Sequence, residues 1–371
     1  MLRVYHFVLD HRVGGPHVYV DTLRKALDGK IRSIIVTTGR GPMTDMTLLN
    51  LRHVWAPLYA VEMIANILWL VGAVLLGRIK REATIFNVHG GANLAPVVAA
   101  RIVGIPVVWN FHETTPQFRA LVAVGRWVLN GHPHTLVVVA NKAKEVYGLK
   151  GAELIPATVD TVFWSRDEVS DEELAACGWP NFVNVEGRPF RLLAVGNINP
   201  FKGIDILLEA MAEIDGPWHL KIIGAELDTH REYAATLHTR AYEIVSAKRE
   251  CVVDFLGWRE RTQVRALLAG TDVFVLPSRS EACPIALLEA MAMGCYCIAA
   301  DVGDVVRMTE NYSGSRVFPS ESVESLRQNI EQMRTNYKIP NSKSDRIDGE
   351  WQLGIIAAKV LSIYSRFLTK S

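Results

Sequence analysis

The stretch DVFVLPSRSEACPIALLEAMAMG, residues 272–294, passes from an apolar strand through a polar loop into an apolar helix. Pro284 suits the first turn of that helix, so Glu281 lies in the loop before it. Glu289 then lies about a turn and a half inside the helix, where the apolar pattern gives no reason for an acid. The stretch therefore predicts a strand-loop-helix unit of an α/β fold, with two carboxylates near the start of the helix.

Similar apolar runs recur along most of the chain, and each is followed by a turn and a helical pattern. They occupy residues 2–9, 32–39, 84–90, 106–113 and 135–141 in the first half, and residues 191–198, 219–225, 251–258, 272–278 and 296–301 in the second. Because their hydrophobicity is continuous rather than alternating, they predict parallel strands buried on both faces. The expected fold class is α/β, with two doubly wound, Rossmann-like domains.

The chain has 371 residues, which is more than one hydrophobic core usually serves. The strand-helix alternation breaks at residues 166–190, which are acidic and contain Pro and Gly, so we expect a linker there. The first domain is expected to span residues 1–165 and the second residues 191–349. The apolar helix in residues 350–371 is expected to pack back on the first domain.

Charge and cysteine content exclude several classes of protein. The 40 Lys and Arg residues balance 39 Asp and Glu residues, which leaves a formal net charge of +1 and no polycationic surface for nucleic acid. The five cysteines are odd in number and form no CxxC pair, which favours reduced thiols in a cytoplasmic protein over disulfides or a zinc site. The first residues lack the basic lead and the cleavage site of a signal peptide. Their short apolar run predicts a β-strand instead.

One apolar block, residues 54–77, carries Glu62 as its only charge and is followed by the basic segment RIKR at residues 78–81. Its uninterrupted part is shorter than the roughly 20 residues that a membrane-spanning helix needs. Three alternatives remain open at this point: a core helix, a helix on a membrane surface and a membrane span. The first two are favoured, and contact between residues 54–81 and a membrane surface is an expectation of the sequence.

The turns after the strands carry the candidate binding residues, because ligands bind beyond the carboxyl ends of strands in such sheets. Gly14 and Gly15 follow the first strand, where glycines let backbone N–H groups approach an anion but also suit any tight turn. They do not form the GxGxxG pattern of a dinucleotide site. Lys202, in VGNINPFKG, occupies the equivalent turn of the second half and is either a solvated lysine or a phosphate ligand.

Glu281 and Glu289 together suggest one elongated ligand. If the interval between them were wholly helical, their Cα atoms would lie roughly 12 Å apart. The carboxylates of a glycosidase lie about 5 to 9.5 Å apart, which disfavours that class, although side chains could shorten the separation. Two acids that each accept hydrogen bonds from hydroxyls, with a lysine and a helix N-terminus for phosphates, fit a nucleotide sugar.

Seven motifs in order resemble the retaining GT-B glycosyltransferases of the GT4-type family, also called glycosyl transferases group 1. The resemblance covers most of the chain and centres on the E-x7-E pattern of Glu281 and Glu289. The other motifs are the Gly14-Gly15 turn, NVHGG at His89, NFHE at His112, IPATVD at residues 155–160, VGNINPFKG at residues 195–203 and VLPSRSE at residues 275–281. It implies two Rossmann-like domains that face each other across a cleft.

The resemblance also implies roles for single residues. Glu281 would bind hydroxyls of the donor sugar, Glu289 would bind ribose hydroxyls, and His112 would lie near the transferred sugar, so that His112 and Glu281 are the catalytic candidates. Lys202 and the backbone of Gly15 would contact the diphosphate. The remaining donor-binding candidates are Gly14, Asn197, Arg259, Cys283, Pro284 and Ile285. For His89 a buried strand-end histidine is the better interpretation, and His132 and His134 are interpreted as loop residues rather than metal ligands.

One departure from the family is Asn197, which stands where the family often has an arginine. Because the arginine is missing, the phosphate site lacks one fixed positive charge. The mechanism that the resemblance implies is metal-independent transfer of a hexose-type sugar with retention at the anomeric carbon. The leaving diphosphate would help to deprotonate the acceptor, and catalysis would depend on positioning and electrostatics.

The co-substrate expected from the resemblance is a UDP- or GDP-sugar, with no metal and no other cofactor. The acceptor expected is a lipid-linked or membrane-proximal glycan of bacterial polysaccharide synthesis, which would place the protein in the cytoplasm or peripherally on the inner membrane's cytoplasmic face. Two alternatives belong to other classes. A nicotinamide-dependent oxidoreductase would need a Gly-rich fingerprint, and a membrane-associated scaffold would not need Glu281, Glu289 and Lys202 together.

Overall fold

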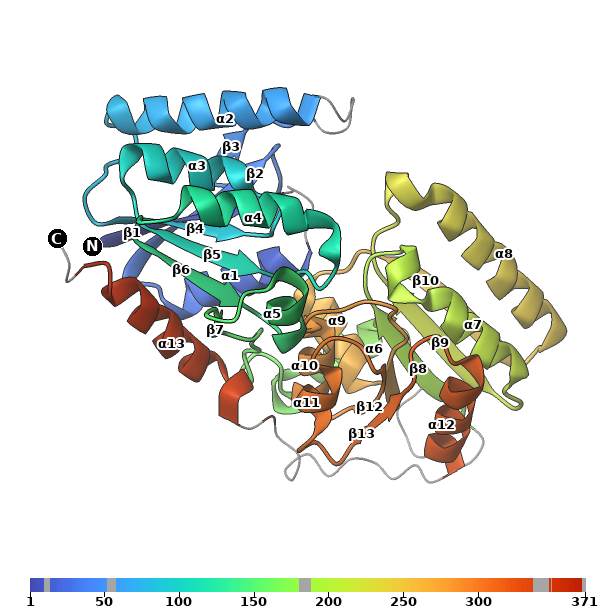
Figure 1. Ribbon diagram of the computed structural model, residues 1–371. Coiled ribbons are helices and arrows are strands. Elements are labelled where there is room, and N and C mark those ends of the chain that lie inside the picture. Colours follow the sequence, from blue (N-terminus) through green and yellow to red (C-terminus); the bar gives the residue numbers. More distant parts are fainter. Residues whose placement is uncertain (10–13, 52–57, 180–187, 336–346, 348, 369–371) are drawn as a thin grey trace. The chain divides into compact units, whose positions relative to one another are not determined.

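The computed structural model describes residues 1–9, 14–51, 58–179, 188–335, 347 and 349–368 (Figure 1). Its contacts divide the chain into two units, Met1–Thr158 with Glu350–Ser371 and Val159–Gly349. Within its described residues each unit contains one sheet in which all neighbouring strands pair in parallel.

The first unit contains a seven-stranded sheet with the order β3-β2-β1-β4-β5-β6-β7. Its strands are β1 (Leu2–Val8), β2 (Ile31–Thr38), β3 (Met46–Leu48), β4 (Thr84–His89), β5 (Val107–Phe111), β6 (His134–Val138) and β7 (Glu153–Leu154). Its helices are α1 (Gly15–Ala26), α2 (Leu58–Leu75), α3 (Leu94–Val103), η1 (Pro116–Phe118), α4 (Arg119–Val128), α5 (Asn141–Tyr147), η5 (Gly349–Trp351) and α13 (Leu353–Ser365). Figure 1 shows α3 and α4 on one face of this sheet and α1 and α13 on the other.

The second unit contains a six-stranded sheet with the order β10-β9-β8-β11-β12-β13. Its strands are β8 (Phe190–Val195), β9 (Trp218–Ile223), β10 (Cys251–Gly257), β11 (Val273–Leu276), β12 (Tyr296–Ala300) and β13 (Ser315–Phe318). Its helices are η2 (Arg166–Glu168), α6 (Asp171–Ala176), η3 (Pro200–Lys202), α7 (Ile204–Glu213), η4 (Asp228–His230), α8 (Arg231–Ala247), α9 (Arg261–Ala269), α10 (Ile285–Ala292), α11 (Val305–Thr309) and α12 (Val323–Thr335).

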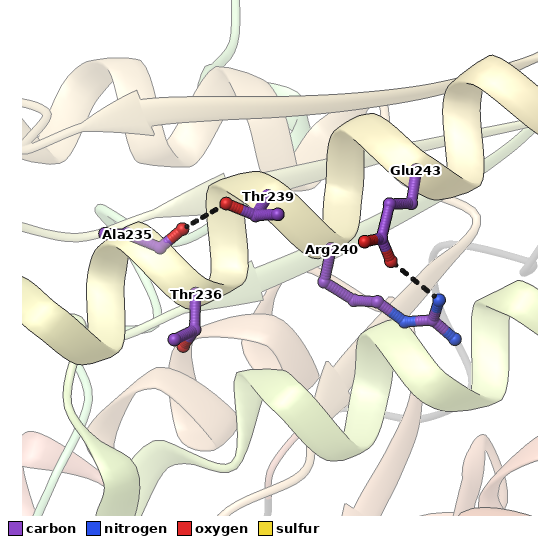
Figure 2. A pocket seen from close by; sticks show the side chains of 5 residues that line it. All are labelled: Ala235, Thr236, Thr239, Arg240 and Glu243. Carbon is purple, nitrogen blue, oxygen red and sulfur yellow. Dashed lines mark hydrogen bonds and ion pairs between the residues drawn. The ribbon is translucent and has the colours of Figure 1, made fainter.

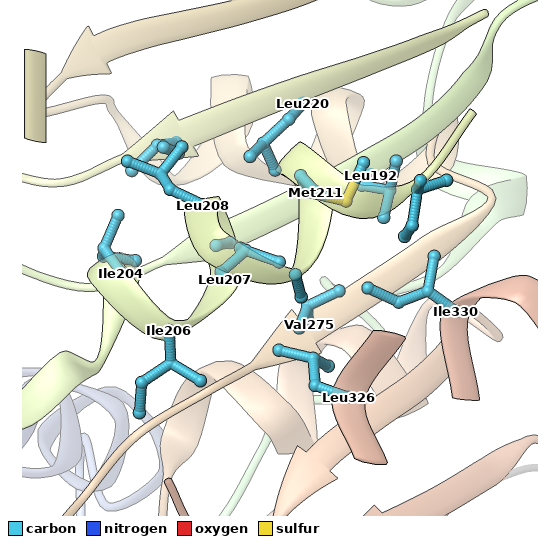
Figure 3. Close-up of a cluster of buried hydrophobic side chains, with 14 of the residues drawn as sticks. Leu192, Ile204, Ile206, Leu207, Leu208, Met211, Leu220, Val275, Leu326 and Ile330 are labelled. Carbon is cyan, nitrogen blue, oxygen red and sulfur yellow. The ribbon is translucent and has the colours of Figure 1, made fainter. Parts of the chain in front are cut away.

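The core of the second unit forms because α7 places its apolar residues on one stripe. Ile204, Leu207, Leu208 and Met211 recur at helical spacing and are all at most 2% exposed. They pack with apolar side chains from the sheet and from α12 in one cluster (Figure 3). The other labelled members of the cluster are Leu192, Ile206, Leu220, Val275, Leu326 and Ile330. This core fixes the position of the turn after β8, which precedes α7.

The predicted doubly wound architecture is confirmed in both units. In each sheet the chain starts at a central strand, builds outward to one edge and then returns to build toward the other edge. The reversal lies between β1 and β4 in the first unit and between β8 and β11 in the second. The ten strands expected from continuous apolar runs are present, because full burial on both faces requires such runs.

Three short strands were not expected from the sequence. They are β3, β7 and β13, and each lies at the edge of its sheet and pairs with one neighbour. Edge strands have only one neighbouring strand and need little apolar sequence, so β13, with the sequence SRVF, has no continuous apolar run. The other edge of the second sheet, β10, was expected because its sequence CVVDFLG is more apolar.

Residues 166–190 were expected to form a linker, but their described part is folded. Residues 166–179 form η2 and α6 within the second unit, and residues 180–187 lie outside the described residues. A capping box between Ser170 and Glu173 starts α6. Glu173 also accepts a hydrogen bond of 2.9 Å from Arg265 on α9, and the Trp179 indole donates to the Leu267 carbonyl at 2.9 Å. Local caps and long-range contacts therefore order a segment whose composition indicates a linker.

Helix α2 is not the core helix that was one of the three alternatives. Its buried residues include Glu62 and Asn66, which are 2% and 3% exposed, whereas only 22% of the helix is buried. The Glu62 carboxylate accepts from the Leu51 backbone N–H at 2.7 Å, and Asn66 Oδ1 accepts from Leu49 N–H at 2.9 Å. The polar side chains of α2 thus face the protein. Among the described helices α2 is long and apolar enough to cross a membrane, which by itself is weak evidence.

The contact between α4 and the sheet gives a stability prediction. A Cβ atom on Gly125 would lie 2.4 Å from the Trp109 ring and 3.0 Å from Leu94, whereas a Cβ on Gly72, in α2, would meet nothing within 4 Å. We expect Gly125→Ala to lower the free energy of unfolding by about 1–3 kcal/mol through overpacking. Gly72→Ala should raise it by up to about 1 kcal/mol through helix propensity. Urea unfolding followed by circular dichroism measures both, and equal effects would contradict the packing.

Candidate functional site

The predicted residues of the second unit lie at the point where its strand order reverses. Lys202 is in the turn after β8, and Glu281 is in the loop after β11. These strands are neighbours, and the chain leaves them toward opposite edges of the sheet. Loops that diverge in this way leave a crevice beyond the carboxyl ends of the strands, which is where ligands bind in open α/β sheets.

Lys202 and Glu281 form an ion pair at this point. The Lys202 Nζ atom lies 2.6 Å from Glu281 Oε1, and the Ser278 hydroxyl donates to the same oxygen at 2.8 Å. The lysine side chain is 27% exposed and the glutamate side chain 11%. A partly buried pair is screened less by salt than a surface pair, so both charges are held in fixed positions beside the helix start.

Arg279 joins the loop after β11 to the turn after β8 and to Asp205 in the first turn of α7. The guanidinium of Arg279 donates to both carboxylate oxygens of Asp205, at 2.8 and 2.6 Å, and also to the Pro200 carbonyl at 2.8 Å. The Arg279 backbone N–H donates to the Phe201 carbonyl at 2.8 Å. Burial acts to raise the pKa of Asp205, but hydrogen bonds from Arg279 and Tyr233 outweigh it and lower the pKa. The bidentate pair therefore sets the position of Lys202 relative to Glu281.

Two glycines allow these loops to approach each other. Gly203 has φ +63°, and a Cβ atom there would lie 2.1 Å from the Pro277 carbonyl oxygen. A Cβ atom on Gly303 would lie 2.4 Å from the carbonyl oxygens of Glu281 and Ala282. Any side chain at either position would push the Glu281 loop away, so both positions require glycine.

Glu289, on α10, is 8% exposed, and its side-chain carboxyl group has no hydrogen bond to another described residue. Burial raises its pKa to about 8, although the nearby Arg261 acts to lower it. A buried carboxyl group without a hydrogen-bond partner is costly and needs an explanation beyond packing. Hydroxyl groups of a ligand are one such explanation, because a carboxylate accepts two hydrogen bonds from adjacent hydroxyls.

The remaining predicted residues of the second unit have structural partners. Pro284 is the N-cap of α10, Ile285 begins the helix, and Cys283 is buried with its Sγ atom 3.9 Å from Met308 Sδ. Asn197 Oδ1 accepts a hydrogen bond from the Ala225 backbone at 3.3 Å. Arg259 is half-buried and donates to the Trp258 carbonyl at 3.0 Å. The structure thus brings Lys202 and Glu281 into contact and places Arg259 in a separate turn after β10.

In the first unit Gly14 and Gly15 lie at the start of α1. Gly14 is the N-cap, with extended φ and ψ of −148° and −174°, and its carbonyl accepts from the N–H groups of His17 and Val18. A Cβ atom on either glycine would meet nothing within 4 Å among the described residues. Neither the backbone shape nor crowding by the described residues demands glycine at these two positions. Residues 10–13 lie outside the described part of the chain.

His112 follows β5 and contacts the histidine that ends β4. His112 Nε2 lies 2.9 Å from His89 Nδ1, and His89 Nε2 lies 3.4 Å from Nδ1 of His6, on β1. His112 is half-buried, whereas His6 and His89 are buried. Burial lowers the pKa of all three imidazoles, to about 4 for His112 and about 3 for His6. All three rings are therefore neutral at pH 7.

The sequence interpretation missed a row of polar side chains that crosses the first sheet. His6, Asn87, His89 and Asn110 lie inside strands that otherwise read as apolar, and the strand register pairs His6 with Asn87 and His89 with Asn110. A polar residue in a strand buried on both faces is unusual, so its repetition in neighbouring strands was the available signal. His89 is a buried strand-end histidine, but its partner is the predicted catalytic residue His112.

One described pocket lies away from all of these residues. It is a depression of about 400 Å³ on α8, lined by Ala235, Thr236, Thr239, Arg240 and Glu243 (Figure 2). Its polar groups bond within the protein, since Thr239 donates to the Ala235 carbonyl and Arg240 pairs with Glu243 and with Glu209. It contains none of the predicted residues. Among the described residues, no group of three His, Cys, Asp or Glu side chains is arranged to hold a metal ion.

Comparison with known proteins assigns the second unit. Residues 189–336 match the family model described as Glycosyl transferases group 1, and this segment contains Lys202, Glu281 and Glu289. The match covers less than half of the chain and agrees with the predicted family over the region that contains Lys202, Glu281 and the reversal of strand order in the second sheet.

Curated relatives of this group 1 region are partial matches. Glycogen synthase from Xanthomonas oryzae pv. oryzae is 30% identical over 141 residues, which are 38% of this chain and 26% of the relative. The amylovoran biosynthesis glycosyltransferase AmsK from Erwinia amylovora is 25% identical over 148 residues, which are 38% of this chain and 34% of the relative. The chain thus spans only about a quarter to a third of these two relatives.

Solved structures match the whole chain in fold. Anabaena Alr3699/HepE, crystallised in complex with UDP and glucose, has a TM-score of 0.74 and 16% identity and covers 100% of this chain and 99% of its own. A glycosyltransferase from Rickettsia africae has a TM-score of 0.77 and 16% identity, with the same coverage. At such identities the likeness shows the fold alone, which is the GT-B fold predicted from the sequence.

The raised pKa of Glu289 predicts a pH dependence of stability. The folded state holds the proton up to about pH 8, whereas an unfolded glutamate loses it near 4.5. Stability should therefore fall by about 1.4 kcal/mol per pH unit between these values. We expect Glu289→Gln to melt above the wild type at pH 8.5 and level with it near pH 4. Glu250→Gln, an exposed acid, is the control, and identical profiles for the Glu289 variant and the wild type would show that Glu289 is not buried as described.

Proposed function

We propose that this protein transfers a hexose-type sugar from a nucleotide-sugar donor, with retention at the anomeric carbon, to a glycan acceptor. The observation that carries the proposal is the buried Glu289 carboxyl group, which has no hydrogen-bond partner among the described residues and lies in the same motif as Glu281, the partner of Lys202. Core packing does not explain this acid, and a ligand with adjacent hydroxyl groups does. The match of residues 189–336 to the glycosyl transferases group 1 model supports this interpretation.

Each group in this motif suits one part of such a donor. Glu289 would accept hydrogen bonds from the ribose hydroxyls, and Glu281 from hydroxyls of the transferred sugar. The Lys202 ammonium would neutralise the diphosphate. Because Lys202 already bonds Glu281 at 2.6 Å, the donor must share or replace that bond, which couples recognition of the phosphate to the orientation of Glu281.

The donor proposed is a UDP- or GDP-sugar. Support comes from the structurally similar Anabaena HepE, whose structure holds UDP and glucose. Asn197 bonds the Ala225 backbone and supplies no charge where the family often has an arginine, so Lys202 carries the phosphate interaction in this loop. His112, Gly14, Gly15 and Arg259 remain proposed contacts of the substrate.

The proposed mechanism needs no resident metal or other cofactor. The leaving diphosphate oxygen would accept the acceptor's proton on the face from which it departs, so the glycosidic bond breaks as the new bond forms on the same face. The protein's part would be to position both substrates and to stabilise the charge that develops on the diphosphate. Lys202 and the N-terminus of α10 are the groups of the second unit that supply positive potential there.

Donor binding and transfer test the proposal together. UDP- and GDP-sugars are screened by thermal shift, with NAD and NADP as controls for the oxidoreductase alternative. Ligand at about a hundredfold over Kd should add roughly 2.7 kcal/mol to the apparent stability. We expect Glu289→Ala to lose the shift and Glu281→Gln to fold normally but transfer sugar at least about a hundredfold more slowly.

Glu250→Gln, a change at an exposed acid of the same unit, is the matched control and should behave as the wild type. A shift with NAD or NADP alone would overturn the assignment in favour of an oxidoreductase. Wild-type turnover by Glu281→Gln would remove that residue from the site. A protein that binds none of these ligands would favour the scaffold alternative.

We further propose that the acceptor is lipid-linked or lies at a membrane, and that the protein is cytoplasmic and binds the inner membrane peripherally through α2. The support is the apolar outer face of this helix, on which Val61, Ile64, Leu68 and Leu75 recur at helical spacing and are all exposed. A surface helix usually buries its apolar side chains and exposes its charged ones. Helix α2 shows the reverse, because these apolar side chains are exposed and Glu62 is buried.

The segment after α2 adds positive charge. Arg78, Lys80 and Arg81 are exposed and follow the helix directly. Basic residues near an anionic membrane each contribute about 1 kcal/mol to binding, and the apolar face of an interfacial helix supplies the remainder. The relative AmsK, an amylovoran biosynthesis glycosyltransferase, supports a role in bacterial glycan synthesis.

Liposome flotation tests the membrane contact. The wild type should float with vesicles that contain anionic lipid and bind neutral vesicles less. Because burying one large apolar side chain contributes about 1.5–3 kcal/mol, the double variant Ile64→Glu/Leu68→Glu should bind at least about tenfold more weakly. Tyr242→Glu, at an exposed site on α8, is the matched control. Equal flotation of the double variant and the wild type would exclude α2 as the contact.

A further inference from the structure

A row of buried polar side chains crosses the first sheet and ends at His112. It runs from α13 through strands β4 and β1 and back to the ends of β4 and β5. Its members are Tyr364, Asn110, Asn87, His6, His89 and His112. Each neighbouring pair lies within hydrogen-bond distance, so the direction of one bond fixes the direction of the next.

A backbone carbonyl sets the direction at the interior end. The Val88 carbonyl can only accept, so the group of Asn110 that lies 3.2 Å from it is the NH₂ group. The same Nδ2 atom contacts the Asn87 side chain, which must therefore present its oxygen there. The NH₂ group of Asn87 is then the end that lies 3.2 Å from His6 Nδ1 and 2.6 Å from the Tyr364 hydroxyl.

The direction passes along the histidines. Since the Asn87 NH₂ group cannot accept, His6 Nδ1 carries no proton. The single lone pair of His6 Nδ1 is then shared by the Asn87 NH₂ group at 3.2 Å and by Nε2–H of His89 at 3.4 Å. A neutral His89 protonated at Nε2 has a bare Nδ1, which lies 2.9 Å from His112 Nε2. His112 therefore donates through its own Nε2–H, and the lone pair of His112 lies on Nδ1.

The charge states agree with this direction. Burial lowers the pKa of His6 to about 3 and that of His112 to about 4, and burial with the nearby His112, His6 and His17 lowers the pKa of His89 far below its usual value. Doubly protonated rings, which would donate in both directions, are thus not formed at pH 7. Tyr19 lies with its ring edge toward both His89 and His112 and keeps their surroundings aromatic.

We propose that His6 and His89 are positioning residues that hold His112 in its neutral Nε2–H form, so that His112 offers Nδ1 to a hydroxyl group of the transferred sugar. This inference rests on the proposed function. His112 then accepts a hydrogen bond at Nδ1, and the hydrogen bonds of the strand residues Asn87 and Asn110 determine this tautomer. A substrate that presents only an acceptor atom at this point would not be held.

Nitrogen-15 NMR of the histidine-labelled protein reads the tautomers without any activity measurement. At pH 7 we expect His6, His89 and His112 each to be neutral and protonated at Nε2. An Nδ1–H form at any one of the three, or a charged ring at His89, would overturn the inference. Because this arm uses the wild-type protein, it decides the question whether or not a variant folds.

Asn87→Asp should reverse the row. A carboxylate can only accept, so His6 would donate through Nδ1–H, His89 through Nδ1–H, and His112 would become the Nδ1–H form. Tyr364→Phe is the matched control, because it removes the other contact of the Asn87 NH₂ group and leaves the bond to His6 in place. We expect all three tautomers to be unchanged in Tyr364→Phe and reversed in Asn87→Asp. Unchanged tautomers in a folded Asn87→Asp protein would overturn the relay.

Kinetics separate positioning from a purely structural role. In Asn87→Asp we expect kcat to fall by about three- to tenfold, the size of one altered hydrogen bond, while the donor KM stays near the wild-type value, because Lys202 and Glu289 hold the nucleotide. Tyr364→Phe should keep the wild-type kcat. If Asn87→Asp only lowers the melting temperature and leaves the tautomers and kcat unchanged, the row serves stability alone and the inference is wrong. Expected tautomers in a protein that binds no nucleotide sugar would refute the proposed function while upholding the polarity of the row.

Discussion

The bidentate pair between Arg279 and Asp205 is the interaction on which the candidate site depends. Arg279 lies in the loop after β11 and Asp205 in the first turn of α7, which follows the turn after β8. Without a bond between them, the spacing between these two segments would not be fixed. With it, Lys202 and Glu281 are held 2.6 Å apart, and the glycines at positions 203 and 303 remove the side chains that would oppose this approach.

The sequence predicted the sheets well because parallel strands buried on both faces need long apolar runs. The same reasoning could not find β13, whose sequence SRVF pairs on one side only, or place residues 166–179 in the second unit. The contacts of Glu173 and Trp179 that order this segment join residues 92 and 88 positions apart, and local composition carries no signal for such contacts. The family motifs located Lys202, Glu281 and Glu289, but not the loop clamp formed by Arg279 and Asp205.

The polar row of the first unit was also outside the reach of single-strand patterns. His6 and Asn87 are neighbours only through the register of β1 with β4. Helix α2 shows the reverse difficulty: its composition is that of a core helix, and only the structure shows that Glu62 faces inward and Leu68 outward. In both cases polar side chains are buried where the average hydrophobicity of the segment predicts apolar ones. Such exceptions are common where function rather than stability selects a side chain.

The return of α13 to the first unit has a consequence for biosynthesis. The bond between Asn87 and Tyr364 joins residues 277 positions apart, and Ile356, Val360 and Ile363 of α13 are buried. A nascent chain therefore leaves the apolar floor of its first sheet uncovered until the whole second unit has emerged from the ribosome. Because domains generally fold as units during synthesis, the second unit can be complete before the first, and a translation pause before residue 350 would expose a surface suited to chaperones or to aggregation.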